Sequence, residues 1–387
     1  MLNRVTGRVL TPQGWRLAEV SMAQRIVTIR ELSVPELAGL DPAELPVVLP
    51  GFIDLHVHGA VGRDVMQGGD AALEVARFHA RHGTTAMLAT TMTACEADIE
   101  RALRGVRRSM EALVPEGARI LGVHLEGPFI SEQRLGAQPP AVMRGDMARI
   151  RRWQALAPIL ALTLAPEIEG HLALIPELVA QGMRVQLGHT AGSYDDGVKA
   201  LQAGATGFTH LFNGMSEMSH RQPGIACAAL AHAEFAEIIP DLQHVQPGAI
   251  LAALRAIPKA YGITDATPAT GMPDGEYTLG TQRVFKCMGC VRLALGDSLA
   301  GSALTMDQAL RNLVSLGLDL ADASNRLSRF PADYLGLADR GRIEVGAWSD
   351  LVSLDAELMV QRVWVQGREI PIAPGRNGPE IIARASA

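Results

Sequence analysis

Apolar, strand-like runs that alternate with helix-like stretches are the feature of this sequence that most restricts its fold. Eight such runs occur: 52–58, 85–91, 119–126, 159–165, 184–189, 207–212, 237–242 and 261–265. Helix-like stretches in the gaps include 70–81, 96–113, 176–181 and 194–204. Eight alternating β and α units favour an α/β fold, a (β/α)8 TIM-type barrel. A doubly wound open sheet is the alternative, and it is weakened because no glycine-rich dinucleotide turn follows an early strand.

The two ends of the chain have a different pattern, with short alternating runs separated by Gly and Asp turns. These runs include 8–10, 25–29, 341–346, 350–355 and 363–367. The pattern is typical of antiparallel strands, and neither end is long enough to bury a good core alone. We therefore expect both ends to form one small β-sandwich domain from residues 1–50 and 341–387, with the barrel at 51–340. A hairpin insertion at 276–295 and helices at 305–316 and 322–335 complete the expected barrel region.

Composition argues against several kinds of partner. The chain of 387 residues has a formal net charge of −6, which argues against nonspecific nucleic-acid binding. No run approaches the roughly 18 apolar residues of a membrane helix, and the N-terminus lacks a signal-peptide core. Four cysteines in a chain of this length suggest a reducing compartment, so we expect a cytoplasmic protein. Cys287 and Cys290 have CxxC spacing, but without a second pair they are interpreted as incidental.

A histidine pair lies at the end of the first barrel run, in the stretch 50–59. Side chains alternate between the faces of a strand, so Asp54, His56 and His58 share one face. Two neutral imidazoles at this spacing can both reach one metal ion. The alternative is two hydrogen-bonded histidines in a polar strand end.

Further titratable side chains stand at the ends of other runs, where a barrel places its chemistry. These are His124, Glu126, His189, His210 and Asp265. Imidazoles and a carboxylate suit zinc or iron(II) better than magnesium. The sequence therefore predicts a site for one or two divalent ions, with Asp265 as the proton carrier and a structural salt bridge as its alternative role. His124 is expected to support a ligand, whereas His79, His82, His171 and His232 are expected at the surface or in packing.

With these residues in hand, the chain resembles the amidohydrolase superfamily and, within it, the N-acetylglucosamine-6-phosphate deacetylase family. The resemblance spans nearly the whole length. It rests on motifs that occur in order, at 50–59, 82–85, 124–129, 188–190, 210–215, 221–224, 264–266 and 299–306.

The resemblance implies hydrolysis of an amide, releasing acetate and an amino-sugar 6-phosphate. It implies a main ion on Glu126, His189 and His210, and a second ion that His56 and His58 would share with Glu126. None of the lysines (Lys199, Lys259, Lys286) lies in a predicted barrel strand, so Glu126 would bridge the two ions. The implied substrate contacts are Ala137, Gln138, Asn213, Gly214, Arg221, His244, Leu299, Ala300 and Gly301. Members of this family are usually homodimers in which Arg221 and His244 would reach a neighbouring site.

Two departures from the family pattern fall in the expected substrate pocket. The family usually has His where this chain has Gln138, which can donate a hydrogen bond but carries no positive charge. Leu242 stands where the family has Gly. Both departures favour the alternative of N-acetylgalactosamine 6-phosphate or another N-acyl amide as substrate. A non-catalytic barrel used for binding or assembly is the remote alternative.

Overall fold

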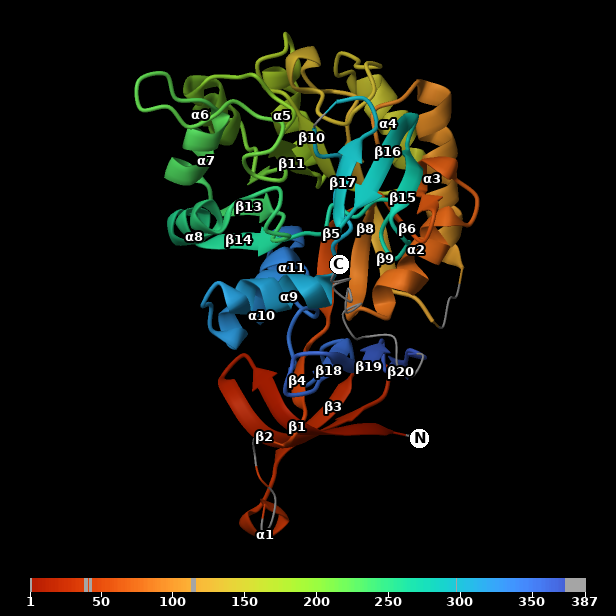
Figure 1. The fold of residues 1–387 in the computed structure, drawn as a ribbon, viewed down its shortest axis with the longest axis vertical. Coiled ribbons are helices and arrows are strands. Elements are labelled where there is room, and N and C mark those ends of the chain that lie inside the picture. Colours follow the sequence, from red (N-terminus) through yellow and green to blue (C-terminus); the bar gives the residue numbers. More distant parts are fainter. Residues whose placement is uncertain (1, 38–40, 42–43, 113–115, 297, 373–387) are drawn as a thin grey trace, which may run out of the picture.

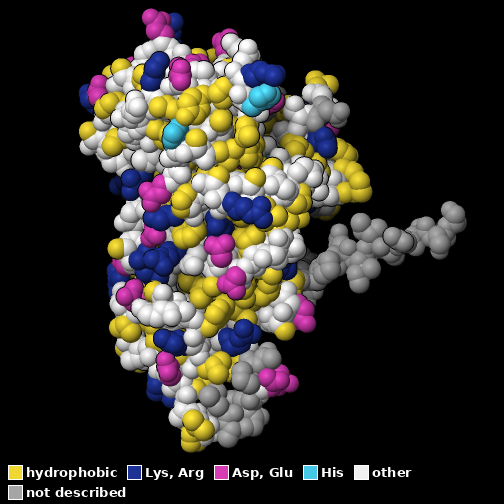
Figure 2. Space-filling model, turned by 90° about the vertical axis from the view of Figure 1, so that its left-hand side faces the viewer, with side chains coloured by type: hydrophobic (Ala, Val, Ile, Leu, Met, Phe, Trp, Pro, Cys, Tyr) yellow, Lys and Arg dark blue, Asp and Glu magenta, His cyan; other side chains and the backbone are white. Residues whose placement is uncertain are grey.

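The computed structural model describes all of residues 1–387 except 1, 38–40, 42–43, 113–115, 297 and 373–387 (Figure 1). A barrel forms the upper part of the view, and a sheet built from both ends of the chain lies below it (Figure 1). Arg, Lys, Asp and Glu side chains are interspersed over the face shown in Figure 2. None of the described helices is long and apolar enough to cross a membrane.

Parallel strands form the predicted barrel. Six of them pair in the order β12-β11-β10-β9-β8-β5, and β13 pairs with β14. Their bounds are β5 (Phe52–Val57), β8 (Thr84–Thr90), β9 (Arg119–Glu126), β10 (Ile159–Leu164), β11 (Arg184–Leu187), β12 (Gly207–Phe208), β13 (Phe235–Ile238) and β14 (Lys259–Gly262). The ring is joined at one seam by a bridge between Val57 and Ala266, and at the other by the 2.8 Å hydrogen bond from the Leu211 amide to the Glu237 carbonyl. The expected barrel is thereby confirmed.

Helices cover the outside of the barrel and continue after its last strand (Figure 1). They are α2 (Ala71–Ala80), α3 (Glu96–Glu111), α4 (Met147–Leu156), α5 (His171–Ala180), α6 (Tyr194–Gln202), α7 (Ile225–His232), α8 (Pro247–Ala256), α9 (Met306–Ser315), α10 (Leu320–Leu327) and α11 (Arg329–Leu335). In α3, Ile99, Leu103 and Val106 recur at helical spacing and are buried. The outer face of α3 carries Glu–Arg pairs such as Glu100 with Arg104. This helix therefore forms where its sequence pattern predicts.

Several predicted boundaries were wrong. Strand β12 covers 207–208 and not 207–212, and β14 covers 259–262 and not 261–265. Helix α5 begins at His171 rather than at Pro176, because His171, Ile175 and Leu178 form a buried stripe that continues across the proline. The stretch 322–335 holds two helices separated at Ser328, whose backbone angles are not helical. Strand β13 covers 235–238 and not 237–242, since Pro240 cannot donate to a strand ladder.

The two ends of the chain meet in one seven-stranded sheet, in the order β20-β19-β18-β4-β1-β2-β3. The strands are β1 (Asn3–Thr11), β2 (Gly14–Met22), β3 (Ile26–Glu31), β4 (Val47–Pro50), β18 (Leu351–Leu354), β19 (Val360–Val365) and β20 (Arg368–Glu369), with helix α1 (Val34–Leu37) after β3. Only β1 and β4 pair in parallel. The sheet has its own core around Val9, Val20 and Trp364. A small β-domain built from both ends is thus confirmed, as one mostly antiparallel sheet. Its boundaries at residues 50 and 341 stay a prediction.

The predicted insertion after the last barrel strand is a three-stranded antiparallel sheet. It consists of β15 (Gly275–Leu279), β16 (Gln282–Cys287) and β17 (Cys290–Leu293). Short elements near the barrel mouth are β6 (Gly59–Ala60), β7 (Arg63–Asp64) and the 3-10 turns Val65–Gln67 and Glu132–Arg134.

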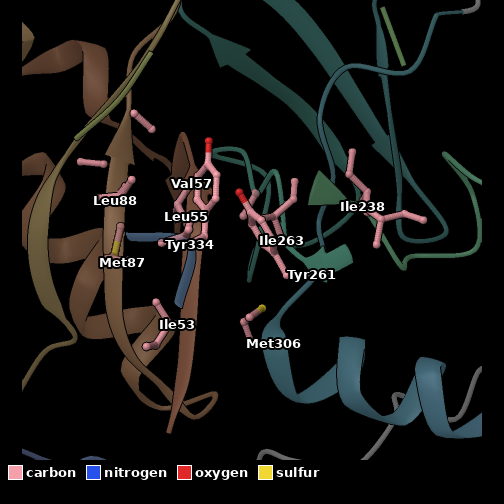
Figure 3. Close-up of a cluster of buried hydrophobic side chains, with 14 of the residues drawn as sticks. Ile53, Leu55, Val57, Met87, Leu88, Ile238, Tyr261, Ile263, Met306 and Tyr334 are labelled. Atoms are coloured by element: carbon pink, nitrogen blue, oxygen red, sulfur yellow. The ribbon is translucent and has the colours of Figure 1, made fainter. Parts of the chain in front are cut away.

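Strand β5 divides its side chains between two faces, as its alternation predicts. Ile53, Leu55 and Val57 belong to a buried apolar cluster that also includes Met306 of α9 and Tyr334 of α11 (Figure 3). Asp54 and His56 alternate with them and therefore point to the other face, inside the barrel.

Candidate active site

A cavity of about 310 Å³ opens at the carboxyl ends of the barrel strands. The residues predicted from sequence that line it are His58, Glu126, Ala137, Gln138, His189, His210, Asn213, Gly214, His244, Asp265, Leu299 and Gly301. Met92, Gly136, Leu279 and Ser298 also line it and were not predicted. A larger hollow of about 510 Å³ lies between the barrel and the small β-domain, but its described lining contains no carboxylate or imidazole. Most of the carboxylate and imidazole side chains predicted from sequence for the site are therefore gathered in the smaller cavity.

Three predicted residues do not line this cavity. His56 is fully buried and lies beside His58. Ala300 is buried in the loop whose neighbours, Leu299 and Gly301, do line it. Arg221 is exposed on the loop before α7 and is not brought to the cavity of its own chain.

Glu126, His189 and His210 converge from three strand ends. Glu126 Oε1 lies 3.2 Å from His189 Nε2 and 2.9 Å from His210 Nε2. The other ring nitrogens face backbone carbonyls, His189 Nδ1 at 2.8 Å and His210 Nδ1 at 3.1 Å. Because a carbonyl only accepts, each Nδ1 carries a hydrogen, and in the neutral imidazole each Nε2 then has its lone pair facing Glu126. This donor set fits a zinc or iron ion.

A second group lies on the other side of Glu126. His56 Nε2 and His58 Nε2 are 3.2 Å apart, and His58 Nε2 is 3.2 Å from Glu126 Oε2. Asp265 Oδ1 is 3.3 Å from His58 Nε2. The two oxygens of Glu126 thus face two different groups, which is the geometry that a bridging carboxylate requires.

Lysine does not compete for that bridging position. Lys259 does begin a barrel strand, β14, contrary to the sequence prediction. It stands at the amino end of that strand, and its ammonium pairs with Glu234 at 2.8 Å. Since the cavity is at the carboxyl ends, Lys259 is remote from it.

The buried charges around Asp265 affect one another. Burial alone would raise the pKa of Asp265, but the neighbouring His56 and His58 rings lower this pKa to about 2. Burial would lower the pKa of His58, but hydrogen bonds to Asp265 and Glu126 raise it to about 9. In this arrangement Asp265 is an ionised carboxylate at neutral pH and faces the cavity.

Strained backbone marks three of these positions. His189, His210 and Asp265 have φ angles of 47°, 28° and 52°. Left-handed backbone is uncommon for residues other than Gly and tends to occur at functional sites, where the surrounding fold over-determines it. Leu242 also has a positive φ of 63°, at the position where the resembling family has Gly.

Two polar residues below the cavity contact the candidate ligands. Glu237, on β13, accepts a 2.9 Å hydrogen bond from His56 Nδ1 and was missed in the sequence. The available signal was a carboxylate inside an apolar run, because such residues are seldom buried without a partner. His124 bonds to Thr163 at 2.8 Å and to the Leu55 carbonyl at 3.2 Å, so its expected supporting role is limited to packing beside the His56 ring.

The four histidines expected at the surface or in packing lie outside the cavity. His79 and His171 are fully buried. His82 pairs with Asp307 at 3.2 Å, and exposed His232 bonds to Tyr194 at 2.6 Å. Packing and local pairing explain all four.

A parallel barrel with convergent His, Glu and Asp at its carboxyl ends is typical of metal-dependent barrel hydrolases. The model of the amidohydrolase family matches residues 47–370, and the chain belongs to this family.

Several relatives are named as deacetylases. The N-acetylglucosamine-6-phosphate deacetylase of Vibrio furnissii is 40% identical over 337 residues, 85% of this chain and 83% of that protein. The N-acetylgalactosamine-6-phosphate deacetylase of Escherichia coli O157:H7 is 37% identical over 370 residues, 93% of this chain and 97% of that protein. Among solved structures, one is a mutant N-acetyl-D-glucosamine-6-phosphate deacetylase of Mycobacterium smegmatis in complex with N-acetyl-D-glucosamine-6-phosphate. It is 33% identical, has a TM-score of 0.87, and the match covers 96% of this chain and 100% of that chain.

Proposed function

We propose that this hydrolase removes the acetyl group of an N-acetylhexosamine 6-phosphate in amino-sugar catabolism. N-acetylglucosamine 6-phosphate is the first candidate, with acetate and glucosamine 6-phosphate as products. The observation that carries the proposal is the placement of Asp265 beside two groups of candidate metal ligands in one cavity. Relatives named for this reaction, 40% identical in the case of Vibrio furnissii, support it.

Glu126, His189 and His210 would hold a divalent ion, zinc or iron, and His56 and His58 would share a second with Glu126. A bound divalent ion makes water more acidic and polarises a carbonyl. Asp265 would take a proton from the attacking water as the water oxygen adds to the acyl carbon. The same carboxyl group would return that proton to the nitrogen as the carbon–nitrogen bond breaks.

His244 is suited to hold the phosphate. Burial alone would lower its pKa, but the Asp241 carboxylate, 2.7 Å from Nδ1, raises it and favours the imidazolium. Since Nδ1–H is engaged by Asp241, Nε2–H is left to donate to an anion in the cavity. Arg221, exposed and outside this cavity, would serve the neighbouring site in a cytoplasmic homodimer.

N-acetylgalactosamine 6-phosphate is the second candidate substrate. A relative named for that sugar is matched over 97% of its length, more than the 83% of the Vibrio furnissii protein. Gln138, the departure from the family pattern that lines the cavity, favours this alternative as well. Leu242 was expected in the pocket too, but it does not line the cavity and packs against the apolar core.

The test is a substrate panel on metal-loaded protein. Acetate release is measured with both N-acetylhexosamine 6-phosphates and with unphosphorylated N-acetylglucosamine, before and after dialysis against a chelator. We expect turnover of a phosphorylated sugar, its loss on dialysis, and recovery with zinc or iron(II). Turnover of the unphosphorylated sugar without turnover of either phosphate would overturn the proposal.

A further inference from the structure

Glu237 is a fully buried carboxylate that does not line the cavity. Its oxygens accept from three nitrogens. Oε2 faces His56 Nδ1 at 2.9 Å and the His210 amide at 3.2 Å, and Oε1 faces Gln186 Nε2 at 3.0 Å. Donors from three parts of the barrel wall thus hold this side chain in one orientation.

Gln186 is itself held in the orientation that suits Glu237. Its Oε1 accepts from the Thr209 hydroxyl at 2.8 Å, so its amide nitrogen is the atom directed at Glu237. Gln186 and Thr209 are both fully buried. One of the three donors that hold Glu237, the Gln186 amide, is therefore fixed by residues that are not candidate ligands.

The hydrogen bond to Glu237 determines which nitrogen of His56 can bind a cation. With the hydrogen on Nδ1 directed at Glu237, the lone pair is on Nε2. Nε2 is the atom that lies 3.2 Å from His58 Nε2 and 3.5 Å from both Glu126 Oε2 and Asp265 Oδ1. An imidazole between a carboxylate and a cation is the usual arrangement by which proteins orient a metal-ligating histidine.

The other candidate ion position does not depend on Glu237 in this way. There, the ring hydrogens of His189 and His210 are directed at backbone carbonyls of Arg134 and Asn213. Glu237 contacts this group only through the His210 backbone amide. Removal of the carboxylate should thus affect the two positions unequally.

We propose that Glu237 is a positioning residue that makes His56 a ligand, so that occupancy of the second ion position depends on it. The inference rests on the proposed metal-dependent function, but not on which sugar is the substrate. Loss of Glu237 should weaken the second ion and leave the ion on Glu126, His189 and His210 in place.

The experiment is a zinc titration of metal-free protein against a chromophoric chelator, with metal content measured after gel filtration. Wild type should bind two ions. In Glu237→Gln, a carboxamide has one acceptor oxygen for three donors. We therefore expect the zinc affinity of the position on Glu126, His189 and His210 to be retained, and that of the second position to fall about 10- to 100-fold. Glu234→Gln, which alters an exposed glutamate close by in sequence, is the matched control and should bind as wild type does.

A double-mutant comparison separates positioning from general damage. His56→Ala should lose the same ion, and adding Glu237→Gln to it should cost no further zinc affinity, because the two residues act through one contact. If Glu237→Gln does not fold, Glu237→Asp is titrated instead; it moves the carboxylate away from His56, and the same selective loss is expected.

Three results would overturn the inference: wild type that binds one ion, a Glu237 variant that keeps both affinities, or one that loses both equally. The proposed function fails separately. Two-ion binding with the selective loss, but without deacetylation of either sugar phosphate, would leave the role of Glu237 intact.

Discussion

Gln138 donates a 2.7 Å hydrogen bond from its amide nitrogen to Oε2 of Glu126, the carboxylate between the two candidate ion positions. The amide orientation is unambiguous, because the oxygen of Gln138 accepts a 2.7 Å hydrogen bond from the backbone N–H of Thr93. Gln138 is buried. It therefore supports the candidate metal centre directly, in addition to lining the substrate cavity.

Gln138→Leu should destabilise the protein and lower its turnover. The change leaves the Thr93 amide without an acceptor in a buried place, which costs about 1–3 kcal/mol in free energy of unfolding. Urea denaturation and steady-state kinetics check the two effects. The matched change at exposed Gln133 should alter neither, and an unchanged free energy for Gln138→Leu would contradict the structure.

Asp265→Asn should abolish most of the activity without unfolding the protein. Asparagine has a similar shape but cannot take a proton, so kcat should fall about 10²- to 10⁴-fold while KM changes little. Kinetics and thermal unfolding of the metal-loaded variant give the result. Asp195→Asn, on an exposed part of α6, is the control. A kcat close to wild type would exclude Asp265 as proton carrier.

His244→Asn should weaken binding of phosphorylated substrates selectively. Loss of a charge-assisted hydrogen bond of about 1.5–3 kcal/mol predicts a fall in kcat/KM of about 10- to 100-fold. The fall should be absent for an unphosphorylated N-acetyl sugar, if it is hydrolysed at all, and for the exposed control His232→Asn. An equal fall in kcat/KM with phosphorylated and unphosphorylated substrates would show that His244 does not act by binding the phosphate.

Asp307 should stabilise the fold at neutral pH and cease to do so in acid. Burial alone would raise its pKa, but His82 and Arg311 hold this pKa well below its usual value. A pKa that is lower in the folded chain means a contribution that is present above the unfolded-state pKa and lost as pH falls through the folded-state pKa. Asp307→Asn should therefore cost about 1.5–3 kcal/mol at pH 7 and progressively less in acid.

Denaturation at several pH values measures this effect. Asp322→Asn, which breaks a more exposed pair with Arg326 on α10, should cost only about 0.3–0.5 kcal/mol. If Asp307→Asn costs the same at acidic and neutral pH, the carboxylate charge is not what stabilises this contact.

Much of the fold follows from the order of the apolar runs. Parallel strands of a barrel all end at the same rim, so the sequence alone predicts that Glu126, His189, His210 and Asp265 lie close together. Boundaries were less accurate where packing overrides a local signal. Pro176 marks a helix start in the sequence, but the buried stripe on either side of it carries the helix through.

The sequence by itself determined the barrel, the small β-domain that both chain ends form beside it, and the residue types gathered at the barrel rim. Alternation and strand order suffice for these, since they depend on the backbone. Only the tertiary structure decided that Glu237 faces His56, that Gln138 faces Glu126, and that Arg221 lies outside its own cavity. Hydrogen-bond directions are set by side chains that meet across the barrel from distant parts of the chain, and no local pattern encodes them.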